Sequence, residues 1–298
     1  MKKFAPFLIL LAGIFWGMIG IFVRRLNALG FASMDIVALR ALTTTVLLGA
    51  FLLIYDKKKL HIRLKDIWCF AGTGIVSIIY FNFCYFKAIT LTSLPVAAIL
   101  LYTAPAIVMV LSALLFREKI TKIKVVSLIL TFAGCVLVTG IFSGAQTLNV
   151  QGILIGLGAG LGYALYSIFG RFALQKGYDS LTISFYTFLF AALGTIPFAN
   201  YAAMVEICSG DWKIVGFCLL FGLVSTVLPY IAYTRGLQEI ENSKASIIAS
   251  IEPVTATLLG VIAYHETLSV LAVLGVILVL AAIVLNNHEF IRRRNDGK

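Results

Sequence analysis

The chain contains 298 residues, of which 61% are hydrophobic and only 12% are charged, and its formal net charge is +11. Soluble domains carry roughly a quarter charged residues, so this composition excludes an ordinary water-soluble domain and indicates a multi-pass membrane protein.

Ten apolar stretches follow one another along the chain. They cover residues 6–26, 35–55, 66–88, 93–116, 122–142, 150–172, 180–204, 212–235, 243–265 and 267–287. A helix needs about 20 apolar residues to cross the hydrocarbon core of a bilayer, and each stretch is long enough. The runs are continuous rather than alternating, which excludes the strands of a membrane β-barrel. We therefore predict an all-α membrane protein with ten transmembrane helices.

The chain also matches itself after a shift of 147 to 148 residues. Arg24 falls on Arg171, Tyr85 on Tyr233, Lys87 on Arg235, Pro105 on Pro253 and Glu118 on Glu266. This pattern predicts two fused copies of one unit, residues 1–145 and 146–298, with five helices each. Because five is an odd number, the second copy crosses the membrane in the opposite direction. Inverted repeats of this kind are typical of secondary transporters.

The positive charges are distributed unevenly between the two sides of the predicted bundle. With both termini in the cytoplasm, nineteen of the 24 lysines and arginines lie on the cytoplasmic side. Only Arg24, Arg25, Lys87 and Lys213 lie outside, and Arg40 falls within a span. This distribution agrees with the positive-inside rule. Because the basic residues are divided among short loops, we expect a lipid bilayer around the protein and no nucleic-acid partner.

No set of residues suggests catalysis or metal binding. The three histidines and five cysteines are scattered at spacings that fit neither a metal site nor a disulfide framework. A membrane-embedded enzyme or scaffold is the alternative class, but such enzymes need clustered acids or metal ligands at one membrane face. The short loops provide none, so we predict no catalytic residues, no metal and no cofactor.

Glycines recur one helical turn apart in two of the predicted spans. They are Gly13 and Gly17 in the first span, and Gly156, Gly158, Gly160 and Gly162 in the sixth. The second group superficially resembles a phosphate-binding loop, but it follows no strand and lies inside an apolar helix. We interpret both groups as surfaces where helix backbones approach closely.

Two charged residues lie away from the ends of the predicted spans, where a charge is costly unless it is paired or faces water. Glu252 is the only acid near the centre of a span, and Pro253 follows it. Glu252 either bonds freed backbone or a neighbouring helix, or it lines a cavity and takes part in proton coupling. We expect Arg40 to reach the outer surface with its long side chain. Contact with a substrate in a cavity is the alternative, with Asp35 or Glu252 as partner.

Polar and aromatic side chains near the middle of the spans form the candidate substrate site. Their polar atoms need partners, which either a ligand cavity or hydrogen bonds between helices would supply. The predicted substrate-binding residues are Asn82, Tyr80, Tyr102, Tyr163, Tyr230, Trp16 and Ser250.

Prolines predict where the helices are interrupted. Pro105 and Pro253 occupy equivalent mid-span positions in the two copies, and Pro229 interrupts the eighth span. A proline within a helix removes one hydrogen bond and breaks or kinks the helix. Paired breaks near the midplane indicate the site of a transporter, so the fourth and ninth spans should border the pathway.

The motif around Glu252 resembles a known family. Residues 250–256 read Ser-Ile-Glu-Pro-Val-Thr-Ala and are followed by Leu259-Gly260 and His265-Glu266, while the first copy has Ala104-Pro105-Ala106 and Arg117-Glu118-Lys119. These segments and the paired five-span halves resemble the EamA-type branch of the drug/metabolite transporter superfamily. The first copy departs from the motif, because Ala104 stands where the second copy has Glu252.

The resemblance implies a basket of ten helices around a central cavity that is lined mainly by spans 1, 3, 4, 6, 8 and 9. It also implies export of amino acids or related small metabolites by alternating access in the bacterial cell (inner) membrane. Multidrug or cation efflux is the alternative, but spans 1 and 6 contain no acid, which counts against it. Protons as a coupling ion, acting through Glu252, are a hypothesis, and no motif specifies the direction of transport or the oligomeric state.

Overall fold

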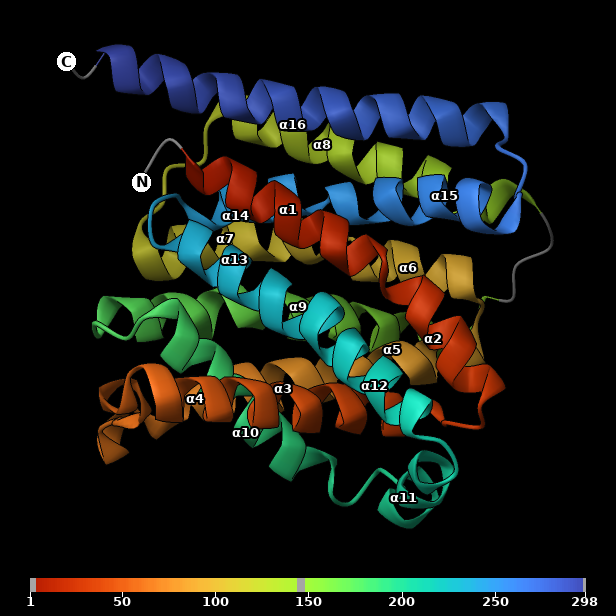
Figure 1. Ribbon diagram of the computed structural model, residues 1–298. Coiled ribbons are helices and arrows are strands. Elements are labelled where there is room, and N and C mark those ends of the chain that lie inside the picture. The colour runs from red at the N-terminus through yellow and green to blue at the C-terminus, as the bar shows by residue number, and fades with distance from the viewer. Residues whose placement is uncertain (1–3, 144–147, 297–298) are drawn as a thin grey trace.

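The computed structural model describes residues 4–143 and 148–296, and the helices in these ranges lie alongside one another in a single bundle (Figure 1). In lipid every backbone polar group must be satisfied internally, which a bundle of helices achieves. The predicted boundary between the two copies, at residues 145 and 146, lies outside the described residues. The same holds for Lys2, Lys3 and Lys298, which contributed to the charge argument.

Within residues 4–143 and 148–296, eight helical segments are long and apolar enough to cross a membrane, and each matches a predicted span. They are Ala5–Ala28, Ser33–Tyr55, Leu64–Leu91, Leu94–Phe116, Val150–Gln175, Trp212–Leu237, Asn242–Tyr264 and Val270–Asn287. The predicted spans 122–142 and 180–204 are shorter in the structure. They correspond to α8 (Lys122–Val138) and α10 (Ser180–Thr195), with 17 and 16 residues. Pro197 lies just beyond α10, where a proline opposes continuation of a helix.

Several spans consist of more than one helical segment. In the first half the segments are α1 (Ala5–Gly17), α2 (Ile19–Ala28), α3 (Ser33–Tyr55), α4 (Ile67–Ala71), a π-helical segment (Gly72–Ile79), α5 (Tyr80–Leu91), α6 (Leu94–Leu101), α7 (Ala104–Phe116) and α8. Short 3₁₀ turns occupy Lys57–Leu60, Leu64–Asp66 and Ile141–Ser143.

The second half of the chain contains a comparable series of segments, but its first span is one continuous helix and an additional short helix follows α10. Its segments are α9 (Val150–Gln175), α10, α11 (Tyr201–Ser209), α12 (Trp212–Gly222), a π-helical segment (Leu223–Val227), α13 (Leu228–Leu237), α14 (Asn242–Ala249), α15 (Ile251–Tyr264) and α16 (Val270–Asp296).

Backbone irregularities occur at equivalent positions of the two halves. Gly30 and Gly177 have φ angles of 99° and 91°, and Arg117 and His265 have φ angles of 57° and 54°. Left-handed conformations are uncommon for residues other than glycine, so the second pair is a distinctive match. Each of these two residues ends a helix, α7 and α15 respectively. The halves therefore share local geometry as well as sequence.

The first helix of each half packs chiefly against the other half. Helix α1 packs against α13, α14 and α15, while α9 packs against α5, α6 and α7. The two halves are consequently interlocked. Figure 1 shows that α1 begins and α16 ends at the same end of the bundle. We call this the terminal end, and the opposite end, where α15 is followed by α16, the distal end.

Candidate functional site

The fourth and ninth spans are interrupted near their middle. Helix α6 ends at Leu101 and α7 begins at Ala104, while only Ser250 separates α14 from α15. Pro105 and Pro253 lie in the first turns of α7 and α15, where a missing N–H costs no helical hydrogen bond. Pro229 likewise lies in the first turn of α13, after the second π-helical segment.

Glycines allow the first helix of each half to approach a break closely. A Cβ atom added to Gly13 of α1 would lie 2.8 Å from the carbonyl oxygen of Ala249, at the end of α14. A Cβ atom added to Gly160 of α9 would lie 2.8 Å from the carbonyl oxygen of Leu100, near the end of α6. Both distances are shorter than normal contacts, so any larger residue would push the helices apart. Gly13 and Gly160 therefore allow close packing of helix backbones, as the sequence predicts, and this packing occurs at the two breaks.

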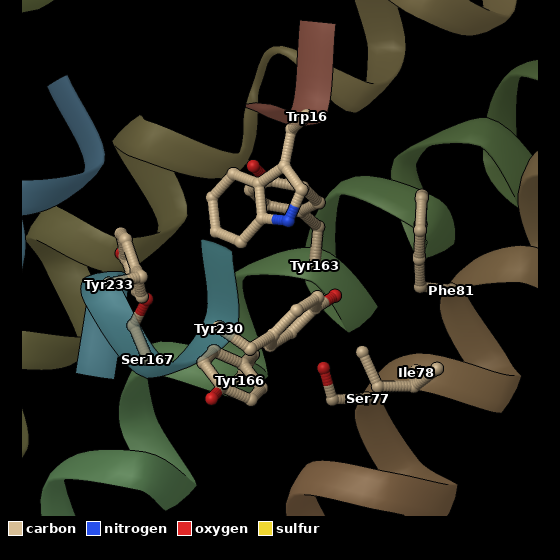
Figure 2. Close-up of a pocket in the computed structure, with 9 residues that line it drawn as sticks. All are labelled: Trp16, Ser77, Ile78, Phe81, Tyr163, Tyr166, Ser167, Tyr230 and Tyr233. Atoms are coloured by element: carbon tan, nitrogen blue, oxygen red, sulfur yellow. The ribbon is translucent and has the colours of Figure 1, made fainter. Parts of the chain in front are cut away.

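A pocket lies between four spans in the interior of the bundle (Figure 2). It contains about 300 Å³ of space between protein atoms, open solvent included. Its lining comes from α1, from the first π-helical segment with α5, from α9 and from α13. The lining residues are Trp16, Ser77, Ile78, Phe81, Tyr163, Tyr166, Ser167, Tyr230 and Tyr233. Each half of the chain thus contributes its first and third spans, in equivalent positions.

The aromatic rings of the pocket contact one another edge to face. The ring centroids of Trp16 and Tyr230 are 5.2 Å apart, and those of Tyr166 and Tyr230 are 4.9 Å apart. The Trp16 and Tyr163 centroids are separated by 6.3 Å. Such geometry is favourable for aromatic pairs and holds the rings in fixed orientations. The pocket therefore offers rigid aromatic walls.

Most polar atoms of the lining have partners within the protein. The hydroxyl groups of Tyr233 and Ser167 are 2.8 Å apart, and the Ser77 hydroxyl donates to the Gly162 carbonyl over 2.7 Å. By contrast, Nε1 of Trp16 is buried and has no hydrogen-bond partner among the described residues. A buried donor without a partner is costly. It is available to an acceptor on a bound molecule.

Glu252 is connected directly to the pocket. The Tyr163 hydroxyl donates a hydrogen bond to Oε2 of Glu252 over 3.1 Å. Glu252 is also the second residue of α15, so its carboxylate lies near the positive end of a helix dipole. The hydrogen bond from Tyr163 and the dipole of α15 both lower the free-energy cost of an ionised carboxylate within the membrane.

Arg40 points into the bundle, which contradicts the expectation that it reaches the outer surface. Its Nε atom donates to the Thr226 hydroxyl over 3.1 Å, and its guanidinium group lies 5.9 Å from the centroid of the Phe221 ring. Thr226 belongs to the second π-helical segment, and such segments occur frequently at functional sites. Asp35 is not its partner, because this carboxylate accepts the backbone N–H groups of Ala32 and Asn200.

Three of the seven predicted substrate-binding residues line the pocket: Trp16, Tyr163 and Tyr230. The side chain of Tyr80 is exposed and its hydroxyl packs against Gly158 of α9. The other three predicted residues contact protein elsewhere.

Asn82 donates to the Ile78 carbonyl over 2.8 Å, and Ser250 donates to the Ser246 carbonyl over 3.1 Å. Tyr102 packs beside the buried Cys135 and Ile251 side chains, next to the break between α6 and α7. Their positions near the middle of predicted spans therefore did not predict which face of the helix these residues occupy.

Six lining residues were absent from the predicted set. They are Ser77, Ile78, Phe81, Tyr166, Ser167 and Tyr233. One signal was present in the sequence: Ser77 matches Ser225 in the self-alignment, and both serines lie in the π-helical segments. Within residues 4–143 and 148–296 the structure contains no group of three or more His, Cys, Asp or Glu residues that could hold a metal ion.

Comparison with known proteins agrees with this architecture. A curated protein of Archaeoglobus fulgidus, named as an uncharacterized transporter, is 29% identical over 276 residues, which cover 91% of this chain and 94% of the relative. The uncharacterized transporter YxxF of Bacillus subtilis is 27% identical and covers 95% of this chain and 89% of its own length. A solved crystal structure with 18% identity superposes with a TM-score of 0.77 over 96% of this chain and 98% of its own, which shows the shared fold.

The profile of the EamA-like transporter family matches the chain twice, at residues 3–140 and 150–288. The two matches coincide with the two halves described above. The chain therefore belongs to the EamA-like transporter family of the drug/metabolite transporter superfamily.

Proposed function

We propose that this protein is a secondary transporter that exports amino acids or related small zwitterionic metabolites by alternating access. The observation that carries the proposal is the pocket between α1, α5, α9 and α13, because equivalent spans of the two halves form its walls. A site on the boundary between two related halves changes its exposure when the halves rock against each other.

The proposed topology has ten spans, two inverted five-helix repeats, and both termini in the cytoplasm. Helices α8 and α10 are short, but each packs along a helix long enough to span, α16 and α3 respectively. At the contact of α8 with α16, a Cβ atom added to Gly134 would lie 2.7 Å from the Gly275 carbonyl oxygen. Close backbone contact through glycine is typical of helices that associate within a membrane.

The positions of the chain ends support an even number of crossings. Helix α1 begins at the terminal end of the bundle, and helix α16 ends there (Figure 1). The basic segments 57–65 and 117–124, which follow α3 and α7, also lie at this end. The positive-inside rule then assigns the terminal end to the cytoplasm of the bacterial cell.

A zwitterionic substrate suits the charges beside the pocket. Arg40 interacts with the lining residue Tyr230 and provides a guanidinium group, which binds carboxylates with paired hydrogen bonds. Glu252 provides a carboxylate bonded to Tyr163. The aromatic faces attract an ammonium group, and the Trp16 N–H accommodates an acceptor. A lipophilic cation would meet Arg40 as a like charge, so we place cation efflux second.

The energy source that we propose is a proton gradient acting through Glu252. This carboxylate lies within the membrane and is hydrogen-bonded to a pocket residue. Binding a proton would remove its charge and weaken its attraction for a substrate ammonium group. Proton binding and substrate release would therefore be linked.

Counterflow in proteoliposomes tests the proposal. Vesicles loaded with a single unlabelled amino acid should accumulate the labelled form only when they contain the protein. Tyr230→Phe, which removes a hydroxyl from the pocket, should raise the half-saturating concentration by about tenfold or more, since lost polar contacts to a substrate are costly. Tyr80→Phe is the matched control because the Tyr80 hydroxyl lies outside the pocket.

Two outcomes would contradict the proposal. Accumulation of tetraphenylphosphonium without counterflow of any amino acid would assign the protein to cation efflux. Equal loss of counterflow in Tyr230→Phe and Tyr80→Phe would show that the pocket does not bind the substrate.

A further inference from the structure

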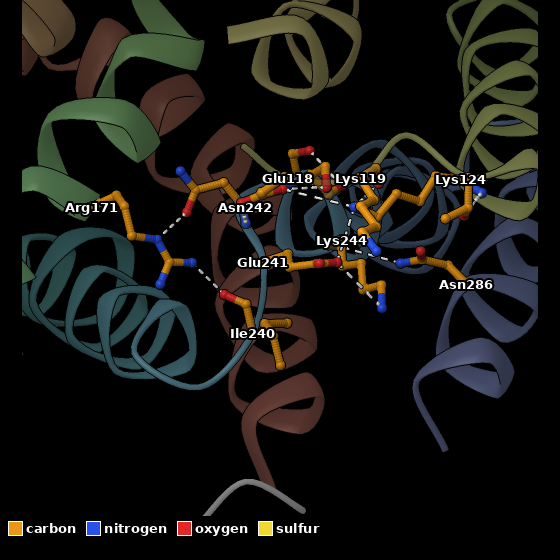
Figure 3. A network of polar contacts seen from close by, with 12 residues as sticks. Glu118, Lys119, Lys124, Arg171, Ile240, Glu241, Asn242, Lys244 and Asn286 are labelled. Atoms are coloured by element: carbon orange, nitrogen blue, oxygen red, sulfur yellow. Dashed lines mark hydrogen bonds and ion pairs between the residues drawn. The ribbon is translucent and has the colours of Figure 1, made fainter. Parts of the chain in front are cut away.

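Glu118 caps the start of α14 at the terminal end of the bundle (Figure 3). Its Oε1 accepts the Asn242 N–H over 2.7 Å, and its Oε2 accepts the Ser243 hydroxyl over 2.6 Å and the Ser243 N–H over 3.2 Å. The first N–H groups of a helix have no partner within the helix, so a carboxylate binds them strongly. Arg171 donates to the side chain of Asn242 over 2.8 Å and to the carbonyl oxygen of Ile240.

These residues are buried together. Asn242 and Ser243 have no exposed surface, and only 8% of the Glu118 side chain is exposed. Lys124 is also buried and forms an ion pair of 2.9 Å with Glu241. We call this set the terminal latch: Glu118 and Arg171 bound to residues 240–243.

The same residue types occur at the distal end in the equivalent positions, but they are not docked. Glu266 and Arg24 match Glu118 and Arg171 in the self-alignment, and they pair with each other over 2.7 Å. Their side chains are 48% and 57% exposed. The segment that matches residues 240–243 is 92–95, at the start of α6. Among the described residues, the side chain of Glu266 bonds to Arg24 rather than to this segment.

Helix packing has the same asymmetry. At the terminal end α14 packs on α7. The equivalent pair at the distal end is α6 and α15, and no contact of comparable extent joins these two described helices. Leu94, the first residue of α6, is exposed. Among the described helices, the contact between α14 and α7 at the terminal end therefore has no counterpart of similar extent between α6 and α15 at the distal end, although the two halves correspond in sequence.

Building on the proposed transport function, we propose that Glu118 and Glu266 are alternating latches. In this structure Glu118 caps α14 and closes the cytoplasmic side. In the opposite state Glu118 releases α14, and Glu266 accepts the N–H of Leu94 at the start of α6 while Arg24 moves to the Thr92 carbonyl. Each half would then have the conformation that the other half has here.

The two latches differ in strength. Ser243 provides two of the three hydrogen bonds that Glu118 accepts, one from its N–H and one from its hydroxyl. The matching residue in the first half is Pro95, which has neither group. The distal latch therefore makes fewer hydrogen bonds, and the outward-open state is favoured when no substrate is bound.

Labelling from each side of the membrane tests the latches without any substrate. The five native cysteines are replaced and Ser167→Cys is introduced on the pocket wall. A membrane-impermeant methanethiosulfonate is then applied to right-side-out or inside-out vesicles. The reference protein should react faster from the outside. Glu118→Gln should lower the ratio of outside to inside rates by about tenfold, the order expected for loss of a charged hydrogen bond.

Two further variants, Glu266→Gln and the control Glu239→Gln, show whether the change in labelling ratio is specific to the terminal latch. Glu266→Gln weakens only the distal latch, so it should leave or raise the outside preference while slowing turnover. Glu239→Gln removes a nearby carboxylate outside the terminal latch and should leave the ratio unchanged. An unchanged ratio in a folded Glu118→Gln protein, or an equal change in Glu239→Gln, would overturn the proposal.

The labelling result is independent of the transport result. If no substrate is carried but the ratio shifts as described, the latches stand and the proposed transport function fails. If counterflow is normal in the reference protein and the ratio does not shift, transport stands and the latches fail. The melting temperature of each variant, measured in detergent, shows whether it is folded.

Discussion

The hydroxyl group of Tyr163 on α9 donates a hydrogen bond of 3.1 Å to the carboxylate of Glu252 on α15. This contact joins the wall of the pocket to the only acid near the centre of a predicted span. A change of charge on Glu252 would therefore alter the hydrogen bonding of a residue that lines the pocket.

We expect Glu252→Gln to abolish the response of transport to a proton gradient while preserving counterflow. Glutamine still accepts a hydrogen bond from Tyr163 but cannot lose or gain a proton at neutral pH. The measurement is accumulation in proteoliposomes with and without an imposed pH gradient. Glu206→Gln, on the exposed face of α11, is the control. Gradient-dependent accumulation by Glu252→Gln would exclude this residue as the coupling group.

Arg40→Gln should weaken binding of substrates that carry a carboxylate. Glutamine cannot form the paired, charged hydrogen bonds of a guanidinium group, so we expect about a tenfold or larger loss of affinity. Competition with the methyl ester of the same amino acid provides the comparison, because the ester should bind the variant and the unchanged protein alike. Arg25→Gln, which changes an exposed arginine, should have no effect. Similar losses for the acid and the ester would place the carboxylate elsewhere.

Gly13→Ala should destabilise the protein, whereas Gly20→Ala should not. An added Cβ atom at Gly13 would lie 2.5 Å from Ile251 Cγ2 and 2.8 Å from the Ala249 carbonyl oxygen, while Gly20 has no atom within 4 Å of the added position. Overpacking costs about 1–3 kcal/mol, and alanine favours an open helical position by about 1 kcal/mol. Thermal unfolding in detergent measures the stability of both variants. A lower melting temperature for Gly20→Ala alone would contradict the close contact of α1 with the break.

The terminal latch should become less stable in acid. Burial opposes ionisation of Glu241, but Lys124 and Lys244 outweigh it and hold the pKa of Glu241 below its ordinary value of 4.5. A lowered folded-state pKa contributes stability above the unfolded value, and this stability is lost as the pH falls through the folded value. Unfolding temperatures measured between pH 7 and pH 3 should therefore fall below about pH 4.5.

Glu241→Gln isolates the contribution of this residue to the acid response. The variant should be less stable at neutral pH and should lose less stability on acidification, because glutamine does not titrate. Glu239→Gln should retain the original pH response. If the pH curves of Glu241→Gln and the unchanged protein were parallel, another group would be responsible.

The positions of the helices and of their breaks could be predicted well because both depend on local properties. Apolar length places a helix in the bilayer, and Pro105 and Pro253 each lie in the first turn of the helix that follows a break, where a proline is tolerated. The pocket was predicted less well. Tyr80 and Ser77 belong to the same span, yet only Ser77 lines the pocket. The π-helical segment between residues 72 and 79 changes the angular spacing of side chains, so the face that a residue presents does not follow from its position in the sequence.

The charged residues illustrate the same division. Asp35 and Arg40 are close in sequence, but Asp35 caps backbone N–H groups and Arg40 bonds to Thr226, which is 186 residues away. A long side chain can reach either the surface or the interior, and the choice depends on which acceptor the fold brings near.

The sequence by itself determined the membrane environment, the positions of the apolar spans, the match of the chain with itself and the family resemblance, because hydropathy, proline and repeated residues act locally or are read directly. Only the tertiary structure decided which aromatic residues meet around the pocket, where Arg40 points and which of the two equivalent glutamates is docked. These properties depend on contacts between residues far apart in the chain. Glu118 and Glu266 are the same residue type in matching local conformations, and only their surroundings distinguish them.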